Sequence, residues 1–541
     1  MRPAACFAVL VASSLVGMAA HADLIPPRPK PSPTASATKA DTTAAAPAST
    51  AKPAGEKPAK GDPGADEPAA DEPAADKPTA DKPAPKPAPT PRPPKPAADK
   101  SPETAKKPEP IPKLHFAVRR VKLENGLRVV LLPDTTTPTV AIHVAYDVGG
   151  RNEERGRSGF AHLFEHMMFQ GSANVARGEH FRLVTSHGGI LNGTTSEDST
   201  NYFEMLPSSE LALGLWLEAD RMKSLDVSQQ NFENQRAVVK EEYRMRVENA
   251  AYVPAEMRLQ ELVYRGYWPY EHSPIGTMRD LDAAELSWVR EFHARYYAPN
   301  NAVLAIAGDF DESQALALVR QYFGDAKPAN TPKLELPPLP EQTAPRHAVV
   351  EDAHAKLPAI FMGWAGPPSG DADHYALKLA ARILGDGESS RLYRALVRER
   401  PLAIAVDAGM RGLRGPDMFE LVVKLASGAR VAQARKIVDG LLSDLARLGP
   451  SDEEMKKVRA RVQARFLLGL QSNFARAQTL AELELFRGDA SLVNEELDKY
   501  LAVTKDDVKR VVAKYLTANR RSIVEVKPGT NGHAKEEGAK K

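Results

Sequence analysis

The sequence predicts an α+β protein made of two similar halves that follow a long segment without a fold of its own. Three observations lead to this prediction. Alternating apolar and polar stretches, typical of strands, and stretches with helical spacing succeed one another from about residue 116 to residue 528. Two patterns of the first half recur in the second half at nearly the same spacing. More than half of the 45 prolines lie before this region.

The composition excludes several kinds of site. There are 72 Lys+Arg against 70 Asp+Glu, so the chain has no basic footprint for nucleic acid. The single cysteine, Cys6, excludes a disulfide framework, a cysteine-based zinc knuckle and a thiol nucleophile in the mature chain. No glycine-rich phosphate loop supports a nucleotide-binding fold. The chemistry therefore has to come from histidines, carboxylates and hydroxyls.

Residues 1–22 have the features of a signal peptide. A positive start is followed by an apolar stretch at 4–20, and Ala20-His21-Ala22 offers the small-x-small pattern that signal peptidase cuts. Cleavage there predicts an exported protein, periplasmic or secreted, that begins at Asp23. The alternative is an uncleaved membrane anchor, because the apolar stretch approaches the lower limit for spanning a bilayer.

Residues 23–112 are dominated by Pro, Ala, Lys, Asp, Thr and Glu and contain near-repeats. Such a segment buries too little apolar surface to offset the entropy of ordering, which predicts a disordered Pro/Ala-rich linker. Residues 530–541 are likewise predicted to be a disordered tail.

The first domain is predicted at residues 113–325. Residues 118–132 alternate around Asn125-Gly126, which predicts a hairpin, and 140–148 read as another strand. The pattern turns helical at Gly159. Helices are expected at 210–224, 228–249 and 286–297, before a buried strand at 303–308.

The second domain is predicted at residues 346–529, after a linker at 326–345 that is rich in Pro, Leu and Glu. The pattern of residues 289–297 recurs 219 residues later, and that of residues 225–228 recurs 223 residues later. Two matches in the same order and at nearly the same offset favour a duplicated unit.

One short motif carries the candidate chemistry, His162-Leu163-Phe164-Glu165-His166. On a helix the two histidines lie one turn apart on one face, and Glu165 lies on the same side. Two imidazoles at this spacing can bind one zinc ion, while a neighbouring carboxylate holds and deprotonates the metal-bound water. This H-x-x-E-H order is the inverted zinc-peptidase motif.

A catalytic zinc normally has three protein ligands, so a third is required. The candidates are Glu241 and Glu242, adjacent residues within the predicted helix at 228–249. Their side chains project about 100° apart, so only one of them can face the metal. The residue pattern does not choose between them.

Residues 158–172 resemble the active-site block of the pitrilysin/insulinase family of zinc metallopeptidases, especially its short bacterial and mitochondrial-processing-peptidase-like branch. The segments 192–203 and 217–222 continue the resemblance, which extends over about 116–528. It implies two homologous α/β roll domains, each an antiparallel-rich sheet covered by helices, that form a half-clamshell. It also implies one zinc ion per chain, with Glu242 as the third ligand.

The resemblance further implies a substrate site at Asn192, Gly193 and Thr194, on a strand edge beside the metal. A peptide would add there as an extra strand. Many relatives have alanine where this chain has Gly193. Taken alone, Asn192-Gly193 is a common turn dipeptide, and the residues by themselves favour that interpretation.

The second domain has no copy of the metal motif. Residues 379–384, which should parallel the zinc helix, read Leu-Ala-Ala-Arg-Ile-Leu, and Arg465 stands near the position that matches Glu242. Active relatives often have an Arg and a Tyr, seven residues apart, that hold the substrate carbonyl. Val397 and Ile404 take those positions here. We therefore predict a homologous partner subunit that supplies the pair, in a heterodimer or alternatively a homodimer.

Together these features predict a zinc-dependent endopeptidase that hydrolyses peptides or unfolded protein segments in a closed chamber. His162, His166 and Glu242 would bind zinc, while Glu165 would take a proton from the metal-bound water and pass it to the leaving amine. The alternative is a catalytically silent member of the family that binds peptides or acts as a scaffold. No nucleic-acid partner is expected, and a membrane only if the N-terminal segment stays uncleaved.

Overall fold

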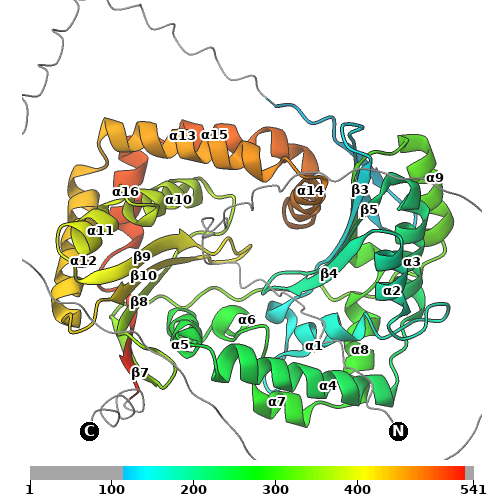
Figure 1. The fold of residues 1–541 in the computed structure, drawn as a ribbon, viewed down its shortest axis with the longest axis horizontal. Helices are drawn as coiled ribbons and strands as arrows, with labels where there is room; N and C mark the ends of the chain where they lie inside the picture. Colours follow the sequence, from blue (N-terminus) through cyan, green and yellow to red (C-terminus); the bar gives the residue numbers. More distant parts are fainter. Residues whose placement is uncertain (1–113, 530–541) are drawn as a thin grey trace, which may run out of the picture. The chain divides into compact units, whose positions relative to one another are not determined.

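The computed structural model describes residues 114–529. The predicted signal peptide, Pro/Ala-rich linker and C-terminal tail lie outside the described residues. Two sheets and the helices that cover them make up the described part (Figure 1). None of the helices within residues 114–529 combines the length and the apolar character that a bilayer span requires.

The first sheet has six strands in the order β1-β2-β6-β3-β5-β4. All neighbours are antiparallel except β2 and β6, which run parallel. The predicted hairpin is confirmed as β1 paired with β2, with Gly126 in the left-handed region (φ 92°) at the turn. The strands are β1 (Arg119–Lys122), β2 (Arg128–Pro133), β3 (Thr139–Tyr146), β4 (Ile190–Thr195), β5 (Thr200–Pro207) and β6 (Ala302–Gly308).

Nine α-helices lie within the described first half, and the three predicted helices are confirmed among them. The predicted helix at 228–249 is interrupted, because α4 passes into a π-helical turn at Arg244–Glu248. The helices are α1 (Phe160–Met167), α2 (Glu179–Ser186), α3 (Leu211–Ser224), α4 (Gln229–Tyr243), α5 (Val253–Val263), α6 (Trp268–Glu271), α7 (Met278–Ala283), α8 (Leu286–Tyr296) and α9 (Glu312–Phe323).

The second sheet repeats the first. Its order is β7-β11-β8-β10-β9, and its only parallel pair among the described strands, β7 and β11, corresponds to β2 and β6. Its elements are β7 (Arg346–Asp352), β8 (Ala359–Ala365), α10 (Ala372–Gly385), α11 (Arg391–Tyr393), β9 (Ala403–Met410), β10 (Met418–Leu425), α12 (Val431–Leu448), α13 (Asp452–Gly469), α14 (Asn473–Arg487), α15 (Glu496–Ala502), α16 (Lys505–Tyr515) and β11 (Ser522–Pro528). The shared strand order confirms the duplicated α+β unit.

The halves exchange one helix each. Helix α5 of the first half packs on β8 and β11, where Leu259 joins Phe361 and Val524 in one apolar cluster. Helix α14 of the second half packs on β3 and β6, where Leu480 joins Ala305 (Figure 1). Each sheet therefore has apolar side chains on both faces, and every residue of β6 is buried. The predicted linker at 326–345 contains no helix or strand and divides the strands of the first sheet from those of the second. Helices α5 and α14 do not follow this division, because each packs on the sheet of the other half.

Candidate functional site

Helix α1 carries the histidine motif and is buried along its whole length. It begins after Gly159, whose positive φ of 89° suits glycine and which has no side chain to cap the helix. The carboxylate of Glu153 caps the helix instead. It accepts hydrogen bonds from the backbone N–H of Gly159 at 3.0 Å and of Ala161 at 2.8 Å. A carboxylate at a helix N-terminus also interacts favourably with the helix dipole. Glu153 thus sets the position of the helix that holds His162.

His272 holds Glu153 in place. Its Nε2 lies 2.9 Å from Glu153 Oε2, and its Nδ1 lies 2.9 Å from the carbonyl oxygen of Trp268. Because both ring nitrogens face acceptors, the arrangement fits an imidazolium beside a carboxylate. Burial acts to lower the pKa of His272. The hydrogen bond to Glu153 and the negative charge of Glu153 outweigh burial, so the net effect is a raised pKa. Sequence reasoning missed this pair, because nothing local to either residue connects positions more than a hundred residues apart.

Three side chains from two helices converge on one point. His162 and His166 lie one turn apart on α1, and Glu242 lies near the end of α4. Glu242 Oε2 is 3.7 Å from His162 Nε2 and 3.1 Å from His166 Nε2. One ligand atom from each of the three lies within 4.8 Å of the others, and all three residues are buried.

The neighbouring acid points elsewhere. The side chain of Glu241 is 61% exposed and forms an ion pair with Arg244, at 2.9 Å. One step along a helix therefore separates a carboxylate that faces the histidines from one that faces solvent. The structure brings Glu242, and not Glu241, to the two imidazoles.

The chemistry of this cluster fits a zinc ion. Within the described residues, neither ring nitrogen of His162 has a hydrogen-bond partner although both are buried. Burial, followed by the charge of His166, lowers the pKa of His162 to about 3, so its imidazole is neutral, the form that binds metals. Burial raises the pKa of Glu242, but its hydrogen bond with His166 and nearby positive charges outweigh burial and lower the pKa. Two imidazoles and one carboxylate form the ligand set of several catalytic zinc sites.

Glu165 lies beside these residues and is completely buried. Thr195 Oγ1 donates a hydrogen bond to Glu165 Oε2, whereas Oε1 has no partner within the described residues. Burial is the largest influence on this carboxyl and raises its pKa to about 7. The group is thus held by one oxygen and has the other available to accept a proton.

The three predicted substrate residues lie on β4. This strand pairs with β5 and forms the edge of the first sheet, so the interpretation of Asn192-Gly193 as a turn is wrong. Pairing with β5 and the packing of α1 on β4 override the local preference of the dipeptide. A Cβ at Gly193 would lie 3.1 Å from Glu165 Cγ and 3.2 Å from Phe169 Cε2. The glycine therefore leaves room for the carboxylate of Glu165.

Thr195 was not predicted, although it directly follows the predicted residues. We expect Thr195→Val to lower kcat about 10-fold to 100-fold without loss of zinc, because the carboxylate of Glu165 would lose its fixed orientation. Steady-state kinetics and metal analysis of the purified variant test this. Thr185→Val is the matched control, since Thr185 is exposed on α2 and its hydroxyl donates to the carbonyl oxygens of Phe181 and Arg182 in the same helix. Equal kcat for Thr195→Val and the parent would contradict the assignment.

A second group of possible ligands lies in the core of the first half. His180, Glu204 and Glu218 bring ligand atoms within 4.8 Å of one another, all buried. A cation of the chain itself is already there: the guanidinium of Arg221 forms two hydrogen bonds with Glu218 and lies 4.4 Å from the centre of the Tyr202 ring. We therefore interpret this group as a buried ionic network. Glu218 and Arg221 of this network belong to the 217–222 segment, which continues the family resemblance but was assigned no role from the sequence.

The second half keeps the helices but not the ligands. Residues 379–384 lie in α10, as predicted, and Arg465 of α13 pairs with Asp386 at 2.8 Å. Val397 packs against the core of the second half, and the side chain of Ile404 on β9 is exposed. Among the described residues, both possible ligand groups lie in the first half.

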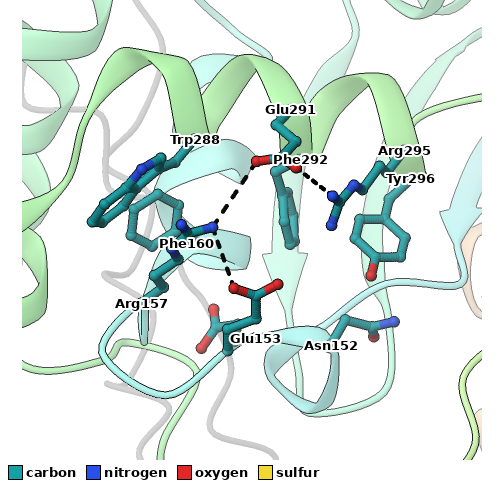
Figure 2. A pocket seen from close by; sticks show the side chains of 10 residues that line it. Asn152, Glu153, Arg157, Phe160, Trp288, Glu291, Phe292, Arg295 and Tyr296 are labelled. Carbon is teal, nitrogen blue, oxygen red and sulfur yellow. Dashed lines mark hydrogen bonds and ion pairs between the residues drawn. The ribbon is translucent and has the colours of Figure 1, made fainter. Parts of the chain in front are cut away.

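A small pocket lies between the start of α1 and α8, and Figure 2 shows the side chains that line it. Its volume is about 30 Å³. Arg157 spans it, with its guanidinium 4.2 Å from the centre of the Trp288 ring and ion pairs to Glu154 and Glu291. A space of this size is enough for one or two water molecules. None of the predicted site residues lines it, so it belongs to the packing that anchors α1 at Phe160.

Two family models match parts of this chain. Residues 128–268 match the model of the insulinase family, peptidase family M16, and residues 286–462 match the model described as the peptidase M16 inactive domain. The zinc protease PqqE of Helicobacter pylori is 30% identical over 411 residues, which cover 75% of this chain and 92% of that protein. The beta subunit of the mitochondrial-processing peptidase of Saccharomyces cerevisiae is 22% identical, over 72% of this chain and 87% of that protein.

A solved structure shows the same fold. The crystal structure of a protease from Helicobacter pylori superposes with a TM-score of 0.73 at 30% identity, covering 76% of this chain and all of that one. The chain therefore belongs to the insulinase family of peptidases, family M16.

Proposed function

We propose that this chain is a zinc-dependent endopeptidase that cleaves peptides or unfolded protein segments. The observation that carries the proposal is the convergence of His162, His166 and Glu242 beside a buried carboxylate, Glu165, that has one oxygen available. Relatives with the name zinc protease support the same reaction class.

In this proposal His162, His166 and Glu242 hold one zinc ion. When bound, zinc acts as a Lewis acid that lowers the pKa of a coordinated water and polarises the scissile carbonyl. Glu165 accepts the proton of the attacking water at Oε1 and later delivers it to the leaving amine nitrogen. Burial raises the pKa of this carboxyl above its usual range, which favours its acting as a proton acceptor and donor.

The edge strand β4 supports binding of an extended substrate. Residues 190–195 pair with β5 on one side only, among the described strands, so the other side can form main-chain hydrogen bonds with a peptide. A peptide bound along Asn192, Gly193 and Thr194 would run beside Glu165, which lies next to Gly193.

The competing function is peptide binding or scaffolding without cleavage. The inactive-domain model matches residues 286–462, which contain none of the four proposed site residues. Digestion of a peptide library by the purified full chain, with and without a chelator, tests the proposal. Chelator-sensitive cleavage with one zinc per chain supports it. One zinc without cleavage, even in the presence of the co-purified partner, favours the competing function.

We further propose a homologous partner subunit that completes the site from a facing second domain and closes the chamber. Val397 and Ile404 stand where active relatives often have an Arg and a Tyr, and Arg398 pairs with Glu388 at 3.5 Å. The yeast relative is itself named as a subunit. Copurification from the native source tests this proposal, and full activity of the isolated chain as a monomer would refute it.

We propose that the protein is exported and that residues 1–22 are removed as a signal peptide. The pattern of the N-terminal sequence supports this proposal. Mass spectrometry of the mature protein should give an N-terminus at Asp23. A chain that still begins at Met1 and is found in the membrane fraction would indicate an uncleaved anchor.

A further inference from the structure

The two carboxylate oxygens of Glu242 have different surroundings. Oε2 faces the imidazoles of His162 and His166, at 3.7 and 3.1 Å. Oε1 lies 2.9 Å from Nε of Arg246. One oxygen is therefore directed at the candidate metal position, and the other is held by a guanidinium.

The backbone that places Arg246 is unusual. Directly after α4 the chain forms a π-helical turn at Arg244–Glu248, in which the N–H of Asn249 donates to the carbonyl of Arg244 at 2.8 Å. Such turns are rare and are frequent at functional sites. The side chain of Arg246 is 30% exposed and that of Glu242 only 8%, so the contact is shielded from most of the solvent.

We propose that Arg246 is a positioning residue for Glu242: it holds Oε1 and so presents Oε2 to the zinc ion. The proposal rests on the proposed function, because it assigns Glu242 as a ligand. Groups that hydrogen-bond to a metal ligand orient it, and their loss typically weakens metal binding about 10-fold to 100-fold.

The duplicated half offers an internal comparison. At the offset of 223 residues, Glu242 corresponds to Arg465 and Arg246 corresponds to Gly469. Helix α13 remains α-helical as far as Gly469, without a π-turn at this place. The half that lacks the acid also lacks the arginine and the turn that presents it.

The sign of the effect separates positioning from simple charge. The guanidinium of Arg246 is positive and lies 2.9 Å from a carboxylate oxygen of Glu242, so it is near the candidate metal position. By Coulomb's law alone, removing this charge would strengthen binding of a divalent cation. Loss of positioning predicts the opposite, a weaker site.

The experiment measures the zinc Kd of the metal-free full chain by competition with a chromophoric chelator. Arg246→Met should raise the Kd 10-fold to 100-fold, and Arg246→Lys should recover part of the loss because Lys retains one donor group. Arg244→Met is the matched control, since Arg244 belongs to the same π-turn but its side chain pairs with the exposed Glu241. It should change the Kd less than twofold. Thermal unfolding of each metal-free variant separates weaker binding from loss of the fold.

A double-mutant cycle locates the effect on Glu242. In the Glu242→Gln background, Arg246→Met should leave the zinc Kd unchanged or lower it, because the carboxylate that Arg246 positions is gone and only the repulsion between its charge and the metal is removed. An unchanged or lower Kd for Arg246→Met in the parent chain would overturn the inference and leave the proposed function standing. Absence of zinc binding by the parent chain would overturn both.

Discussion

Glu165→Gln is expected to lower kcat by about 10³-fold while the zinc Kd changes less than twofold. Glutamine has the shape of glutamate, and its amide oxygen can still accept the hydrogen bond from Thr195. Its NH2 group takes the place of Oε1, which is the oxygen without a partner, and an amide cannot accept the proton of the attacking water. General acid–base groups typically contribute about 10²-fold to 10⁴-fold to rate. Peptide hydrolysis and metal analysis of one preparation measure both quantities.

The matched control is Glu241→Gln, which removes the same charge from an exposed side chain on α4. It should retain the parent kcat. Turnover by Glu165→Gln within tenfold of the parent would show that another group accepts the proton. Loss of zinc by this variant would show that Glu165 is a ligand and not a base.

His162→Ala is expected to lose both zinc and activity. The substitution removes one of three ligands, so zinc affinity should fall by more than the roughly 100-fold that loss of an outer hydrogen-bond partner costs. The fold should persist without metal, since within the described residues His162 makes no hydrogen bond whose loss would leave a buried partner unsatisfied. A ligand that binds only the native state stabilises it, so zinc should raise the Tm of the parent chain and leave that of the variant unchanged.

His187→Ala serves as the control, because His187 is exposed at the end of α2 and, among the described residues, its ring bonds only to Leu183 and Ser186 of that helix. It should keep one zinc per chain and full activity. Retention of one zinc by His162→Ala would place the metal elsewhere. The buried group of His180, Glu204 and Glu218 would then be the first place to examine.

Local patterns predicted part of the secondary structure of the first half. The hairpin around Asn125-Gly126, the strand at β3 and the helices at 210–224 and 286–297 follow from period and turn chemistry, which act over a few residues. The duplication was visible because the two matches kept their order and offset, and the shared strand order confirms it.

Other features depend on residues that are distant in the sequence. Asn192-Gly193 has the composition of a turn, but pairing of β4 with β5 makes it part of an edge strand. The exchange of α5 and α14 between the sheets has no local signal, because any amphipathic helix can pack on either apolar face. Glu153 and His272 meet only through the fold.

The sequence by itself determined the motif, its two histidines and glutamate on one helical face, the duplicated architecture and the family resemblance. Its residue pattern narrowed the proposed third ligand to two adjacent acids, and the family resemblance indicated Glu242. The tertiary structure decided that Glu242 faces the imidazoles, that Thr195 holds Glu165, and that Arg246 holds the far oxygen of Glu242. The physical reason is range: helical spacing orients side chains within a turn, whereas the meeting of α1, α4 and β4 depends on the packing of the whole first half.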